Sequence, residues 1–181
     1  GIAHRPGCIG DEQHAADNGA PLDRRREVAD DLGSHLDGSH LVIHVSRGLV
    51  GNELETLTRL VRRVTPVRRV GVLAGPLSAD ALSEDRPTGG IVGTRFPEIT
   101  DAVRAAVGGP NLRLYSTGDV VGVEVASAMV GLLSVCVGLG QGMGLGPPTL
   151  GILGTRGLAE AARVGVALEA DERTFNGLAG V

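Results

Sequence analysis

No charged residue occurs between residues 125 and 155, a span of 31 positions. A segment this apolar must be covered by protein or by lipid. A transmembrane helix needs about 20 apolar residues, whereas the apolar run 125–139 covers 15, includes two serines and leads into a glycine-rich stretch with Pro147 and Pro148. We therefore predict a buried helix over residues 120–140 that seals a dimer or domain interface, and no membrane span.

Upstream of this segment, apolar runs of strand length alternate with helical patterns. Strands are expected at residues 41–45, 70–73, 91–93 and 112–115, and helices at residues 54–64 and 97–107. The run at 41–45 is typical of a strand buried on both faces, and Asn52 with Glu55 is expected to start the helix that follows. The alternation predicts an α/β layer with a largely parallel sheet, followed by helices over residues 120–140, 158–166 and from 171 onward.

The composition excludes several function classes. The net charge is −4 and only three residues are aromatic, so neither the basic surface nor the stacking platform of a nucleic-acid-binding protein is present. All 17 basic residues are arginines, which leaves no lysine to act as an acid or a Schiff-base nucleophile. Two cysteines, Cys8 and Cys136, are too few for a disulfide framework or a four-cysteine zinc site. We expect no metal site.

Four individual side chains have structural interpretations. His44, inside an apolar run, is expected to be a hydrogen-bonded core histidine. Asp119 is a helix N-cap, and Glu124 is a first-turn charge favoured by the dipole of its own helix. Cys136 lies in an apolar helical pattern and is expected to be a buried, inert thiol. None of these four forms a catalytic constellation with a neighbour in sequence.

Several motifs resemble the NAD(P)-dependent glycerol-3-phosphate dehydrogenase family. They are GDVVGVEV at residues 118–125, TRGLAE at 155–160 and TFNGLAGV at 174–181, supported upstream by VSRGL at 45–49 and LAGP at 73–76. The resemblance runs from about residue 40 to the end. It implies an incomplete Rossmann-like α/β domain over residues 1–118, with 1–40 poorly defined, and the start of a helical substrate and dimerisation domain over 119–181.

The resemblance also implies an activity and a cofactor. Family members reduce dihydroxyacetone phosphate to glycerol 3-phosphate with NAD(P)H, and they place a cofactor contact at each of the positions occupied here by Arg47 and Ala79. A phosphate-type anion of a small molecule is expected at Arg47 and Gly75, because open sheets bind ligands at strand carboxyl ends. Because the apolar 120–140 helix must be covered, we also expect a homo-oligomer or a complex with a partner chain through this helix, and a cytoplasmic location.

This sequence departs from the family at the positions that carry the chemistry. The family's catalytic lysine and the following asparagine correspond to Val130 and Gly131, and a second lysine corresponds to Arg47, whose guanidinium is a poor proton donor. A hydroxyl residue is replaced by Leu77. The glycine fingerprint G-x-G-x-x-G between a strand and a helix is absent. We therefore assign no catalytic residue and expect a divergent or truncated, non-catalytic member; the alternative is a self-association or partner-binding scaffold with residual anion binding.

Overall fold

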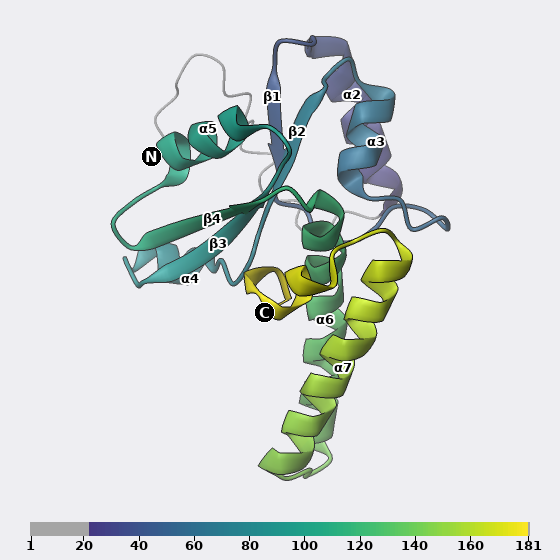
Figure 1. The fold of residues 1–181 in the computed structure, drawn as a ribbon, viewed down its shortest axis with the longest axis vertical. Helices are drawn as coiled ribbons and strands as arrows, with labels where there is room; N and C mark the ends of the chain where they lie inside the picture. The colour runs from purple at the N-terminus through teal and green to yellow at the C-terminus, as the bar shows by residue number, and fades with distance from the viewer. Residues whose placement is uncertain (1–21, 181) are drawn as a thin grey trace.

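A computed structural model describes residues 22–180 (Figure 1). Residues 1–21, including Cys8, lie outside the described part. In chain order the elements are α2 (Leu22–His35), β1 (Leu41–His44), α3 (Leu57–Val64), β2 (Arg69–Ala74), α4 (Ala79–Ser83), β3 (Thr88–Gly93), α5 (Pro97–Val107), β4 (Leu112–Thr117), α6 (Val120–Gly142), α7 (Pro147–Ala167) and two short 3-10 helices, η1 (Glu172–Asn176) and η2 (Leu178–Gly180). The predicted α/β layer followed by helices is confirmed.

The four strands form one sheet in the order β1-β2-β3-β4. β1 pairs with β2 in parallel and β3 pairs with β4 in parallel, but the central pair, β2 and β3, is antiparallel. The sheet is therefore mixed rather than parallel throughout. The lengths of the connections explain this difference. The connection between β2 and β3 contains only the five-residue α4, so β3 runs back alongside β2 in the opposite direction. The eleven-residue α5 is long enough to cross over the sheet, so β4 can run parallel to β3.

Helices cover both faces of the sheet. On one face, α2 and α3 pack over the β1–β2 side, while α6, α7 and the 3-10 helices pack beside them around Val72, Ala74 and Phe175. On the other face, α5 packs Ile99 and Val103 against Val92. The expectation that residues 41–45 are buried on both faces is wrong: Leu41 and Ile43 are 40% and 37% exposed. Within the described residues β1 is an edge strand, and α5, which lies on the face that these two side chains share, leaves both of them partly exposed.

Two further expectations about helix starts are corrected by local contacts. The helix expected from residue 54 begins at Leu57, with Thr56 as its N-cap. Glu55 instead forms a β-bridge with Val50, and its carboxylate binds Arg63. The helix expected at 158–166 begins at Pro147, because proline suits the first turn of a helix.

The helices α6 and α7 form a long hairpin that projects away from the sheet (Figure 1). The first two turns of α6 are buried, but its second half is not: Leu132, Val135 and Leu139 are 56%, 59% and 63% exposed. The prediction of a buried helix therefore holds only near the sheet. Cys136 lies on the projecting half and is exposed, so its predicted burial is wrong. By length and composition alone, α6 is the one helix among the described residues that could cross a membrane.

Candidate functional sites at two edges of the sheet

Arg47 and Gly75 meet at the carboxyl ends of the parallel strands β1 and β2. The Arg47 guanidinium donates a hydrogen bond from Nη2 to the carbonyl oxygen of Gly75, at 3.4 Å. Gly75 has a φ of +116°, and a side chain there would press against the backbone of Gly90, so this turn requires glycine. The structure thus brings together the two residues that the sequence assigned to an anion site. Ala79 begins α4 nearby in the chain, and its side chain lies outside the described part.

A cavity of about 500 Å³ opens beside this pair. Apart from Arg47 and Gly75 its walls are aliphatic, being formed by Val45, Leu73, Ala74, Leu77, Leu82, Val107 and Leu112. The lining contains one cationic group and no carboxylate, imidazole, thiol or amine. It can hold one anionic group against an apolar wall, but it offers nothing that could donate or accept a proton near neutral pH.

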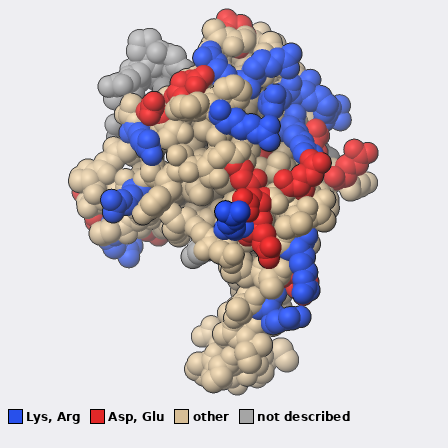
Figure 2. All heavy atoms as spheres, viewed as in Figure 1, with Lys and Arg blue, Asp and Glu red and all other residues tan. Residues whose placement is uncertain are grey.

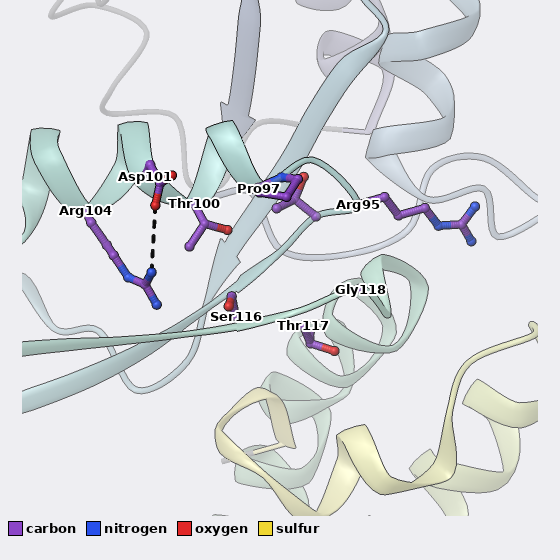
Figure 3. A pocket seen from close by; sticks show the side chains of 9 residues that line it. Arg95, Pro97, Thr100, Asp101, Arg104, Ser116, Thr117 and Gly118 are labelled. Carbon is purple, nitrogen blue, oxygen red and sulfur yellow. Dashed lines mark ion pairs between the residues drawn. The ribbon is translucent and has the colours of Figure 1, made fainter.

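A second, more polar cavity lies at the opposite edge of the sheet (Figure 3). It measures about 360 Å³ and sits where β3 and β4 end and α5 begins. Its lining is formed by Thr94, Arg95, Pro97, Thr100, Asp101, Arg104, Ser116, Thr117 and Gly118. Sequence reasoning missed this cavity, although one signal was available: a threonine and an arginine follow the strand 91–93 directly, just before the helix start at Pro97.

A buried polar cluster joins α6 to the α/β layer. The Glu124 side chain is 2% exposed, and its Oε1 accepts a hydrogen bond from the backbone N–H of Thr58 at 2.9 Å. His44 places Nε2 at 3.3 Å from the same oxygen and at 3.1 Å from Thr58 Oγ1. The prediction for His44 as a hydrogen-bonded core residue is confirmed. The expectation that Glu124 is a first-turn charge of its own helix is wrong: α6 begins at Val120 with no acidic residue in its first turn, and the Glu124 carboxylate instead binds a backbone N–H in the first turn of α3.

Asp119 ties the start of α6 to the chain's last segment. Its Oδ1 accepts from the N–H of Gly122 at 2.9 Å, which confirms the predicted N-cap. Its Oδ2 accepts from Thr174 Oγ1 at 2.6 Å and from the N–H of Asp171 at 3.0 Å. Any side chain at Gly122 would overlap this carboxylate. Asp119 is therefore fully engaged in holding the fold.

The remaining positions highlighted by sequence provide no proton donor. Val130 is partly buried and Gly131 is exposed, both on the projecting part of α6. Arg156 is exposed and lies 3.6 Å from Glu160 of its own helix. Among residues 22–180, no group of three or more histidine, cysteine or acidic side chains could hold a metal ion.

The clear electrostatic perturbations fall outside both cavities. The Asp37 carboxylate accepts hydrogen bonds from the side chain and the backbone N–H of Ser39 and from the side chain of His40. These hydrogen bonds lower the pKa of Asp37 to about 2. The hydrogen-bonded Arg63 guanidinium lowers the pKa of Glu55, and the same pair raises the pKa of Arg63. Asp37 lies in the turn before β1 and Glu55 precedes α3, so these shifts report local structure rather than a reactive centre.

Comparison with known proteins gives a consistent result. Residues 119–181 match the family described as NAD-dependent glycerol-3-phosphate dehydrogenase C-terminus. The glycerol-3-phosphate dehydrogenase [NAD(P)+] of Desulfitobacterium hafniense is 32% identical over 156 residues, or 86% of this chain and 44% of that protein. Its counterpart from Leptothrix cholodnii is 40% identical over 134 residues, or 74% of this chain and 38% of that protein.

Solved structures share the fold. A glycerol-3-phosphate dehydrogenase from Coxiella burnetii superimposes with a TM-score of 0.81 at 24% identity, covering 86% of this chain and 48% of that chain. A structure from Dunaliella salina has the same TM-score at 20% identity, covering 90% of this chain and 28% of that chain. The chain thus spans about half, or less, of the length of the relatives it matches. Over most of its own length, this chain belongs to the NAD(P)-dependent glycerol-3-phosphate dehydrogenase family.

Proposed function

We propose that this chain is a divergent member of the family that binds a phosphate-type anion at Arg47 and Gly75 but does not itself reduce dihydroxyacetone phosphate. The observation that carries the proposal is the Arg47–Gly75 contact at the mouth of an otherwise aliphatic cavity. A guanidinium suits a phosphate oxyanion, because it offers several fixed donors and keeps its charge. A small organic group attached to the bound phosphate would then lie against the aliphatic wall of the cavity.

The proposed lack of catalysis rests on the residues that replace the proton donors. Reduction of a ketone needs a group that protonates the developing alkoxide, and such a positioned acid contributes typically about 10²–10⁴ in rate. The position corresponding to the family's lysine is Val130, and the next is Gly131. Arg47 cannot substitute, because a guanidinium does not release its proton near neutral pH.

The residues of this chain provide only part of what is needed to bind NAD(P). Family members use NAD(P), whose pyrophosphate is usually seated on a glycine-rich turn between a strand and a helix. Within residues 22–180 no such turn carries a G-x-G-x-x-G sequence, and the cavity at Arg47 offers a single cationic group. The residues present therefore do not fit a whole dinucleotide.

The test measures turnover and anion binding separately. The purified chain is assayed for NADH and NADPH oxidation with dihydroxyacetone phosphate at high protein concentration, and no turnover is expected. Calorimetric titration with inorganic phosphate should give millimolar binding that Arg47→Gln weakens at least five-fold. Arg86→Gln, which removes an exposed arginine paired with Glu84, is the control for the change in net charge. Reproducible turnover that disappears in Arg47→Gln would refute the proposal.

A second candidate function is self-association, which the exposed apolar hairpin favours. The tip of the α6–α7 hairpin carries no charged side chain (Figure 2), and exposed apolar patches of this kind mark protein interfaces. In this scheme the chain forms a cytoplasmic homo-oligomer, or docks on a partner chain, through α6. Both functions are compatible, since the hairpin and the Arg47 cavity occupy different parts of the molecule.

A further inference from the structure

We propose that the cavity at the β3–α5 turn is a second oxyanion site, one that binds the phosphate group of a small molecule. The strands β3 and β4 are parallel and α5 crosses between them. In open α/β sheets, ligands bind outside the carboxyl ends of such strands, near the first turn of the crossover helix. Thr94, which follows β3, and Thr117, which ends β4, both line the cavity at that edge.

The start of α5 is open toward this cavity. Phe96 occupies the N-cap position and provides no side-chain hydrogen bond to the first turn. In contrast, Thr56, Ser78 and Asp119 cap the first turns of α3, α4 and α6 with their side chains. The positive end of the α5 dipole thus has no side-chain acceptor, and an anion would occupy that place favourably.

Thr100 is the independent observation that points to a ligand. The residue is only 6% exposed, and its hydroxyl is directed toward the space between α5 and Ser116 (Figure 3). Within the described part of the chain this hydroxyl has no hydrogen-bond partner, whereas helical Ser134 bonds to the carbonyl oxygen of Val130, four residues earlier. The hydroxyl faces the open cavity, where water or a ligand oxygen can complete its hydrogen bonding. The Thr100 hydroxyl is therefore available to donate to an oxygen in the cavity.

The charges around the cavity favour an anion. Two guanidinium groups, Arg95 and Arg104, and one carboxylate, Asp101, line it, which gives a net charge of +1. Asp101 lies 3.9 Å from Arg104 and offsets part of its charge. Arg95 makes no ion pair with any described residue; its side chain extends away from Thr100 and Ser116 (Figure 3), and rotation about its side-chain bonds would bring its terminal nitrogens to a phosphate. The volume of about 360 Å³ exceeds what inorganic phosphate alone would fill, which leaves room for a short hydroxylated chain.

The test follows backbone amides by NMR while inorganic phosphate is added at constant ionic strength, with chloride as the balancing anion. We expect saturable shifts at residues 95–100 and 116–118 with a millimolar Kd. Thr100→Val removes the hydroxyl while keeping the shape, and Arg95→Gln removes the cation; each should weaken binding at least five-fold. Arg113→Gln, on the exposed side of β4, is the matched charge control and should leave the Kd unchanged.

The same titration identifies the source of the phosphate and separates this site from the one at Arg47. Tighter binding of ribose 5-phosphate would indicate an organic phosphate, and equal binding would indicate the free ion. Arg47→Gln should leave these shifts intact, so loss of the Arg47 site and loss of this site are distinguishable. Shifts that persist in both Thr100→Val and Arg95→Gln, or that chloride alone reproduces, would overturn the proposal.

Discussion

Glu124 is the side chain through which α6 holds the α/β layer. Its buried carboxylate accepts the hydrogen bond of the Thr58 N–H, 66 residues earlier in the chain. We expect Glu124→Ala to lower the free energy of unfolding by about 1.5–3 kcal/mol, because it leaves that N–H unsatisfied away from water. Urea denaturation followed by circular dichroism measures this. The control is Glu169→Ala, whose exposed pair with Arg59 should change stability by less than about 0.5 kcal/mol. Equal effects of the two variants would contradict the assignment.

Sequence reasoning at this scale succeeded where the partner was local and failed where it was distant. Asp119 was predicted as an N-cap because its acceptor role depends on residues two and three positions ahead. Glu124 was assigned only to its own helix, because no periodicity in the sequence reveals a contact with Thr58. Cys136 was predicted to be buried from an apolar pattern, but burial depends on what covers each face of the helix, and among the described residues α7 covers a different face of α6 from the one that carries Cys136.

The helix α7 offers a test of close packing against a 3-10 helix. A methyl group at Gly165 would overlap the ring of Phe175, which is 1% exposed at the centre of the core. We expect Gly165→Ala to destabilise the protein by about 1–3 kcal/mol, as over-packed cores typically do. In the same helix, Gly151→Ala meets no atom within 4 Å and should stabilise by about 0.5–1 kcal/mol, since alanine favours helix. Differential scanning calorimetry measures the melting temperature of both variants. A Gly165→Ala protein more stable than the unmodified chain would contradict the prediction, because it would mean that the Phe175 ring can move aside.

Most elements were predictable from sequence, because each follows from a local pattern of apolar residues and caps. The strand pairings were not. The antiparallel contact between β2 and β3 depends on how α4 turns the chain, and a five-residue helix leaves too weak a periodic signal to show direction. The cavity at the β3–α5 turn was missed although Thr94 and Arg95 also follow an apolar strand, because the unpredicted reversal of β3 places them at the opposite edge from Arg47 and Gly75.

The projecting α6–α7 hairpin is the surface through which we expect copies of the chain to associate. Leu139 on α6 and Ile152 on α7 are each 63% exposed in a region without charge. We expect the unmodified chain to self-associate, and the double variant Leu139→Glu, Ile152→Glu to elute as a monomer, because buried carboxylates in an apolar interface are strongly unfavourable. Size-exclusion chromatography with light scattering measures this. Val166→Glu, at the base of α7, should leave the assembly unchanged, and a monomeric unmodified chain would refute the interface.

The antiparallel pairing in the middle of the sheet has a consequence for charge. Because β2 and β3 run in opposite directions, the carboxyl ends of β1 and β2 lie at one edge and those of β3 and β4 at the other. Gly93, the last residue of β3, pairs with Val72, so about four residues of strand, or roughly 13 Å, separate Thr94 from Gly75 along the sheet. The Debye length at physiological ionic strength is about 8 Å, so dissolved salt screens most of the repulsion between an anion at Arg47 and one in the β3–α5 cavity. We therefore expect the two proposed anion sites to be occupied at the same time with only weak mutual repulsion.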